Sequence, residues 1–191
     1  GLPPGIDPDM AAFFGMGRAR VGVAKGMNRF TWDMRYEGAT VFPGMIMWAA
    51  QPQRGPAAPP GKYSVRITAN GETRTVAFEV GLDPRLAADG VTVADLQEQF
   101  ALSVKIRDAV TEANQAVIAI RSIRAQVEER MQKIPPRRKA EIQKLADSLL
   151  QTLGAVEAEV YQVRNRSSQD PLNYPIKLNN KIAALAGVVE S

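Results

Sequence analysis

Residues 93 to 134 read VADLQEQFALSVKIRDAVTEANQAVIAIRSIRAQVEERMQKI and contain neither proline nor glycine. Such a run predicts a single helix about 60 Å long, at ~1.5 Å per residue. Thr92 is followed three residues later by Asp95, a spacing that resembles a capping box and marks where the helix begins. A helix of this length exceeds those of ordinary globular domains, so we expect a second element to pack along it.

The following segment is predicted to be that partner. Pro135-Pro136 ends the first helix, and a second helix is expected from about residue 137 to residue 163. In an antiparallel helical hairpin the numbers of facing residues have a constant sum, and here the paired apolar residues add to 276, or to 277 in one pair. A slip by one heptad passes the same test. The two stripes comprise Ala113, Val117, Ile120, Ile123, Val127, Met131 and Ile134, and Val163, Val160, Val156, Leu153, Leu149, Leu145 and Ile142.

A third helix is expected after a polar connection that spans residues 164 to 174. Pro175 is well placed near the start of this helix. An apolar stripe follows along it, formed by Leu178, Ile182, Leu185 and Val189.

The first half of the chain shows strand patterns. Residues 28 to 36 alternate between apolar and polar side chains, and residues 42 to 48 are apolar on both faces apart from Pro43-Gly44. Asn70-Gly71 is a type I′ turn dipeptide, which predicts a two-residue β-hairpin loop. This loop sets a register that pairs Lys62 with Glu79, Tyr63 with Phe78, and Val65 with Val76.

These patterns predict an α+β chain in two parts. Residues 1 to 23 are expected to form a linker or mobile arm, and residues 24 to 82 an immunoglobulin-like antiparallel β-sandwich. Residues 83 to 92 form a second linker. Residues 93 to 191 form the long antiparallel α-helical hairpin and the third helix.

Composition narrows the classes of function. The chain has 191 residues, no cysteine and no histidine, so thiolate metal sites, disulfides and histidine acid–base chemistry are absent. The net charge of +4 is spread thinly along the chain, without a basic stripe, which argues against nucleic-acid binding. The longest apolar stretch near the start, residues 45 to 50, is far shorter than a membrane-spanning helix requires. We expect no enzyme activity, cofactor or metal in this chain.

Carboxylates give no recognisable catalytic pattern. Glu157 and Glu159 stand two residues apart on the second helix and point in different directions. We interpret them as part of a solvated helix face, with an acid–base pair as the alternative.

Six side chains are candidates for an interaction site: Trp48, Arg121, Arg124, Arg164, Arg166 and Asp170. Arg121 and Arg124 are one turn apart and suit an anion clamp, but Glu128 lies four residues after Arg124 and favours an ordinary ion pair. The group from Arg164 to Asp170 is interpreted as mutual capping of two helix ends, with a ligand site as the alternative. Trp48 is interpreted as a core residue, with an exposed anchor for a partner as the alternative.

Several segments are similar to the C-terminal region of bacterial exported proteins with a sortilin-like (VPS10-type) BNR-repeat β-propeller, often labelled glycosyl hydrolases. They are GMNRFTWDMRY at 26 to 36, FPGMIMW at 42 to 48, PPGKYSVRIT at 59 to 68 and NRSSQDPLNYPIKLNN at 165 to 180. The first half also resembles the immunoglobulin-like module of flagellar hook-capping proteins, in which a Trp-Asp pair precedes a Pro-Gly-x-Tyr strand.

This resemblance implies an exported protein with a β-propeller N-terminal to Gly1, and we expect the chain to be an inner part of that longer protein. The expected function is a non-catalytic accessory module that packs on the propeller or binds other protein surfaces. One alternative is the substrate-binding part of a glycan-active hydrolase, and another is a structural subunit of a cell-surface or membrane-associated assembly.

Overall fold

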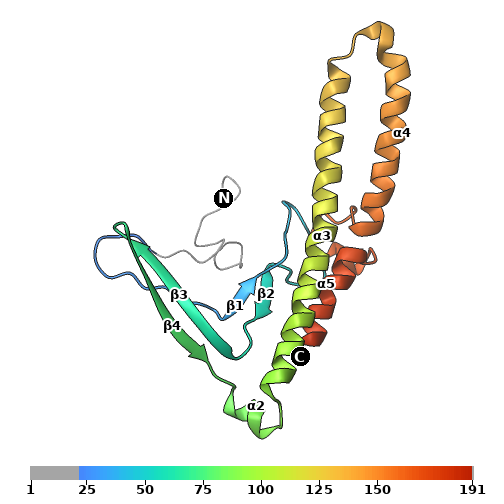
Figure 1. Cartoon of the computed structure of the whole chain (residues 1–191). Helices are drawn as coiled ribbons and strands as arrows, with labels where there is room; N and C mark the ends of the chain where they lie inside the picture. Colours follow the sequence, from blue (N-terminus) through green and yellow to red (C-terminus); the bar gives the residue numbers. More distant parts are fainter. Residues whose placement is uncertain (1–21, 191) are drawn as a thin grey trace.

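The computed structural model describes residues 22 to 190 and shows a mixed α+β chain (Figure 1). Two antiparallel sheets of two strands each precede the helices. The sandwich predicted for residues 24 to 82 is not seen among the described residues. The elements are β1 (Arg35–Glu37), β2 (Arg54–Ala57), β3 (Gly61–Ala69), β4 (Glu72–Val80), α2 (Pro84–Ala88), α3 (Val93–Gln132), α4 (Pro136–Val160), the 3-10 turn η1 (Asp170–Leu172) and α5 (Leu178–Val189).

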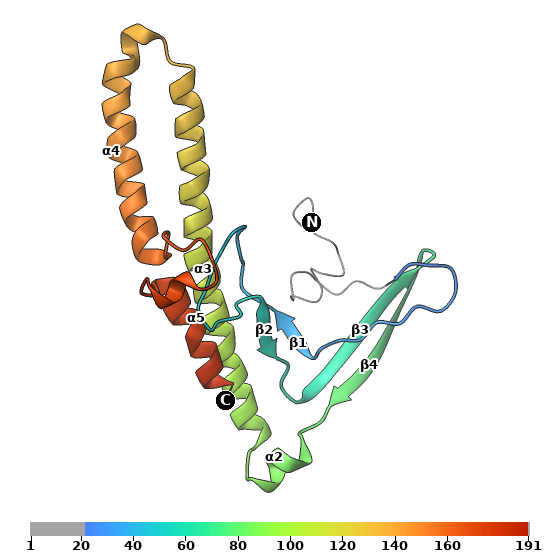
Figure 2. The ribbon, with the colours of Figure 1, turned by 180° about the vertical axis from the view of Figure 1, so that it is seen from behind.

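The long helix α3 contacts α4, α5 and β2. The capping box at its start is confirmed, because the Thr92 hydroxyl accepts from the Asp95 amide at 3.2 Å and the Asp95 carboxylate accepts from the Thr92 amide at 2.8 Å. The α5 helix lies along the N-terminal half of α3, and α4 runs in the opposite direction beside its C-terminal half (Figures 1 and 2). The long helix is therefore covered by different elements along its length.

The predicted stripe of α4 is confirmed in part, because Val160 packs against the buried core, but other positions of the contact face are shifted by one residue. Leu145, Leu149 and Val156 are 68%, 44% and 49% exposed, whereas Ala146 and Glu157 are buried. A shift of one position corresponds to a rotation of about 100° around the helix axis. The rotation follows from polar contacts, because the Glu157 carboxylate binds side chains of α3.

The stripe predicted for α5 is confirmed only in part, because Ile182 packs against the buried residues Val110 and Ala183. Leu178 and Leu185 are about half exposed, and the buried residues of this helix are Asn179, Asn180 and Ala183. The two asparagines turn inward because they hydrogen bond to α3 and to the loop before β2.

The register predicted for β3 and β4 is confirmed. Lys62 lies opposite Glu79, Tyr63 opposite Phe78, and Val65 opposite Val76. Asn70 and Gly71, with φ of 52° and 82°, occupy the left-handed region that a type I′ turn requires. This strand pair stands away from the helices in both views (Figures 1 and 2).

The other two predicted strands are largely irregular. Of residues 28 to 36 only the last two belong to a strand, since Met34 has a φ of 58° and interrupts the extended chain. Residues 42 to 48 form no strand, because the chain bends at Pro43-Gly44, where the glycine φ is 73°. The predicted arm, residues 1 to 23, lies outside the described residues up to residue 21.

The segment from residue 38 to residue 50 packs on the helices. Ala39 shares one small core cluster with Val110 and Ala183. Phe42 shares a second cluster with Val117 and Tyr161. The core of the described residues therefore joins this loop to the middle of α3, and the region beside the second cluster carries the candidate site.

Candidate functional site

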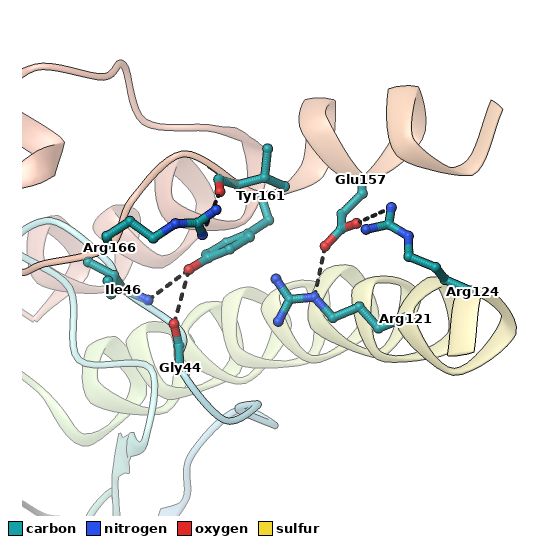
Figure 3. A network of polar contacts seen from close by, with 8 residues as sticks. Gly44, Ile46, Arg121, Arg124, Glu157, Tyr161 and Arg166 are labelled. Carbon is teal, nitrogen blue, oxygen red and sulfur yellow. Dashed lines mark hydrogen bonds and ion pairs between the residues drawn. The ribbon is translucent and has the colours of Figure 1, made fainter. Parts of the chain in front are cut away.

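The candidate site is built around a buried carboxylate. Glu157 of α4 is 2% exposed, and each of its carboxylate oxygens accepts a hydrogen bond from a different guanidinium of α3. Arg121 Nε lies 2.8 Å from Oε1, and Arg124 Nη2 lies 2.9 Å from Oε2 (Figure 3). The two arginines are one turn apart on one face of α3, so both reach the same carboxylate. This pair of charge-assisted hydrogen bonds ties α4 to α3.

Aromatic rings hold Arg121 from the other side. Its guanidinium carbon lies 4.7 Å from the Phe42 ring centroid and 5.4 Å from that of Tyr161, distances typical of cation–π contacts. The two rings meet edge to face at 5.0 Å. The Tyr161 hydroxyl accepts from the Ile46 amide at 3.0 Å and donates to the Gly44 carbonyl at 3.4 Å (Figure 3). The loop before β2, the end of α4 and Arg121 are thus fixed together.

An open groove lies over this network. The groove contains three guanidinium groups and one carboxylate, and it is lined by Pro43, Gly44, Arg121, Arg124, Glu157, Tyr161, Val163, Asn165 and Arg166. Asn165 is 7% exposed, and within residues 22 to 190 its Oδ1 is the buried side-chain atom without a hydrogen-bond partner. The groove therefore carries excess positive charge, and one of its lining residues contains a buried acceptor without a partner.

The connection after α4 is held by Asp170. Its carboxylate accepts from the backbone amides of Arg166 and Ser167 at 2.5 and 2.9 Å, and from the Ser167 hydroxyl at 3.1 Å. These hydrogen bonds hold the pKa of Asp170 below its usual value, and the bond from the Arg166 amide has the largest effect. Arg164 stacks 4.4 Å from the centre of the Tyr174 ring. Asp170 thus caps the backbone of the connection itself rather than the ends of α4 and α5.

Three interpretations of candidate residues need correction. Arg124 binds Glu157 and not Glu128, because α4 brings a buried acceptor within reach of it. For the same reason Glu157 is not on a solvated face, although Glu159 is exposed and pairs with Lys177 at 3.4 Å. Trp48 is 43% exposed and so is not a core residue. The structure brings Arg121, Arg124 and Arg166 together in the groove and leaves Trp48, Arg164 and Asp170 outside it.

The sequence did not predict a second group of polar contacts, which connects α3, α5 and the loop before β2. Asn114 is fully buried on α3, donates to the Thr40 carbonyl at 2.6 Å and accepts from Asn179 at 2.9 Å. The Asn180 side chain accepts from the Trp48 amide at 2.7 Å and donates to the Trp48 carbonyl at 3.0 Å. The sequence did carry a signal for this contact: Asn114 is a lone asparagine at the apolar spacing of α3. Polar residues at such positions often fix the register between helices.

Among residues 22 to 190, no group of three or more potential ligand side chains is arranged to hold a metal ion. In the same part of the chain, no helix has the length and apolar character that a membrane crossing requires. No protein-family model matches the chain, and neither a curated protein nor a solved structure matches it.

Proposed function

We propose that the chain is a non-catalytic accessory module of a larger exported protein and that its β3–β4 pair docks on another protein surface. One observation carries this proposal. Val65, Ile67 and Val76 of the apolar face are 43%, 58% and 57% exposed. An isolated pair of strands is marginally stable in water at best, so this pair is expected to need a covering partner.

The arrangement of the pair suggests how a partner docks. Trp32 covers only one end of the apolar face, with its ring 5.6 Å from that of Tyr63 and 6.1 Å from that of Phe78. Within the described residues β3 and β4 have no other strand as neighbour, which leaves an edge of each strand available for β-augmentation. In this proposal the neighbouring β-propeller covers the apolar face of β3–β4.

Hydrogen exchange tests the proposal. We expect the amides of β3 and β4 to exchange at least about 100-fold more slowly in the longer parent protein than in the 191-residue chain, because docking suppresses local opening. Amides in the middle of α3 should not change and provide the internal control. Val76→Lys on the apolar face should abolish the added protection, whereas Thr75→Lys on the opposite face should not. Equal exchange in the two proteins would contradict the proposal.

A glycan-binding function is the second candidate, and exposed Trp48 favours it. The tryptophan is fixed through its backbone by Asn180, which leaves its ring presented to solvent. An aromatic face of this kind suits stacking against a sugar ring. Binding on a glycan array that is lost in Trp48→Ala would support this function, and absence of binding would count against it.

A further inference from the structure

A second apolar stripe runs along α4 beside the face that contacts α3. Its members recur at alternating spacings of three and four residues, the heptad pattern by which one helix packs along another. Among the helices and strands of residues 22 to 190, α4 contacts only α3 and α5, and the end of the α3–α4 pair projects beyond the other elements (Figures 1 and 2). Leu145, Leu149 and Val156 are therefore exposed. The stripe comprises Ile142, Leu145, Leu149, Thr152 and Val156.

The stripe can be covered without leaving a polar group unsatisfied. Thr152 is its one polar member, and its hydroxyl donates to the Ser148 carbonyl at 3.0 Å. The methyl group of this threonine remains to pack against a partner.

An exposed isoleucine extends the apolar surface onto α3. Ile123 precedes Arg124 by one residue, as Val156 precedes Glu157, and the last two charged residues are in contact. In an antiparallel pair of helices, the positions that precede the contact positions lie on the same side of both helices. The apolar surface thus belongs to one side of the α3–α4 pair.

We propose that a second copy of this chain covers the stripe, in a dimer that pairs the two α4 helices antiparallel about a two-fold axis. The charges at the two ends of the stripe select this occupant. Arg138 and Glu159 continue the heptad spacing at opposite ends, and both are exposed. The Glu159 side chain is 81% exposed beside Lys177, so its carboxylate can accept from a second cation.

The antiparallel arrangement is self-complementary. A two-fold axis beside Leu149 places Ile142 opposite Val156 of the second copy, because both positions are equally far from residue 149. It also brings Arg138 of each copy within one residue of Glu159 of the other. A parallel arrangement would place like charges side by side at both ends, which is unfavourable. Two α3–α4 pairs joined in this way form a four-helix bundle.

The stripe lies on α4, whereas the proposed docking surface is β3–β4, so this inference stands independently of the proposed function.

Sedimentation velocity of the 191-residue chain tests for the dimer. We expect a dissociation constant of about 10 µM or tighter, so the chain should sediment as a dimer at about 100 µM. Leu149→Lys should raise this constant at least about tenfold, because it brings two like charges together at the axis. Gln151→Lys adds the same charge on an exposed face of α4 away from the stripe, and should change the constant less than about twofold. Both positions are exposed in the single chain, so circular dichroism should show both variants folded.

Exchange of the end charges tests the orientation. Arg138→Glu and Glu159→Arg should each weaken the dimer at least about fivefold at low salt, because each replaces two opposite-charge contacts with repulsion. The double variant restores opposite charges only in the antiparallel dimer, and its dissociation constant should return to within about twofold of the original. Val76→Lys alters β4 and should leave the dimer unchanged.

The proposal is overturned if the chain remains a monomer at about 100 µM, which would leave the stripe to a different protein. Equal effects of Leu149→Lys and Gln151→Lys, or failure of the double charge exchange to restore the dimer, would also overturn it. Loss of association in Val76→Lys would overturn it by assigning self-association to the β3–β4 face.

Discussion

Removal of both guanidinium groups around Glu157 should cost the protein a large part of its stability. Arg121→Met/Arg124→Met keeps much of the apolar length of the two side chains but leaves a carboxylate that is 2% exposed without a countercharge. Breaking a fully buried ion pair costs roughly 3–5 kcal/mol. Since the two arginine side chains are 38% and 37% exposed, water screens part of the interaction. We therefore expect a loss of about 3 kcal/mol.

The two single variants should lose different amounts of unfolding free energy. Arg124→Met leaves Glu157 with one partner and should cost about 1 kcal/mol. Arg121→Met should cost more, by about 0.5–1 kcal/mol, because it also removes the contact with Phe42 and Tyr161.

Urea denaturation followed by circular dichroism measures these free energies, and the double variant should melt about 6–12 °C lower. Arg130→Met on the exposed end of α3 is the control and should change stability by less than about 0.5 kcal/mol. Adding Glu157→Leu to the double variant should restore stability to within about 1 kcal/mol of the original chain. The reasoning is refuted if the double variant loses less than about 1 kcal/mol, or if Glu157→Leu lowers its stability further.

Three other substitutions test separate parts of the structure. Asn114→Leu leaves the buried Asn179 amide without its acceptor and should cost about 2–4 kcal/mol in urea denaturation, against less than about 0.5 kcal/mol for the exposed control Gln115→Leu. Gly55→Ala places a Cβ against the backbone of β1, so the nuclear Overhauser contacts between β1 and β2 should disappear. Asp170 has a lowered pKa in the folded chain, so its contribution to stability is present above the usual aspartate pKa and is lost as pH falls through the lowered value. The amide shifts of the two residues that donate to this carboxylate should follow that titration and lose it in Asp170→Asn.

Local signals in the sequence predicted local structure well. The turn at Asn70-Gly71 fixes the register of β3 and β4 through backbone conformation alone, and no distant contact is needed to establish it. The capping box at Thr92 and the break at Pro135 likewise set helix ends within a few residues. Each of these features depends on neighbouring residues, which the sequence displays directly.

The candidate site could not be predicted in the same way because it depends on tertiary contacts between polar residues. Apolar spacing placed Leu149 and Val156 on the contact face of α4, although Glu157 occupies it. A buried carboxylate is stable only if its partners are positioned for it, and those partners lie 33 and 36 residues away on α3. Similarly, the loop from residue 38 to residue 50 leaves the strand pattern because Asn114 and Asn180 hold its backbone on the helices.

The charged cluster also resolves the register that apolar spacing leaves open. A slip of α4 by one heptad preserves the apolar stripes, but it places at the level of Glu157 either Leu150 or Arg164, the latter from the connection that follows α4. With Leu150 there, the two guanidinium groups of α3 lose their buried acceptor. With Arg164 there, a third cation meets them, and like charges at short range are unfavourable. One slipped register therefore loses two hydrogen bonds and the other adds charge repulsion, while the observed register satisfies both oxygens of one carboxylate. The cluster thus specifies which of several equally apolar alignments the two helices adopt.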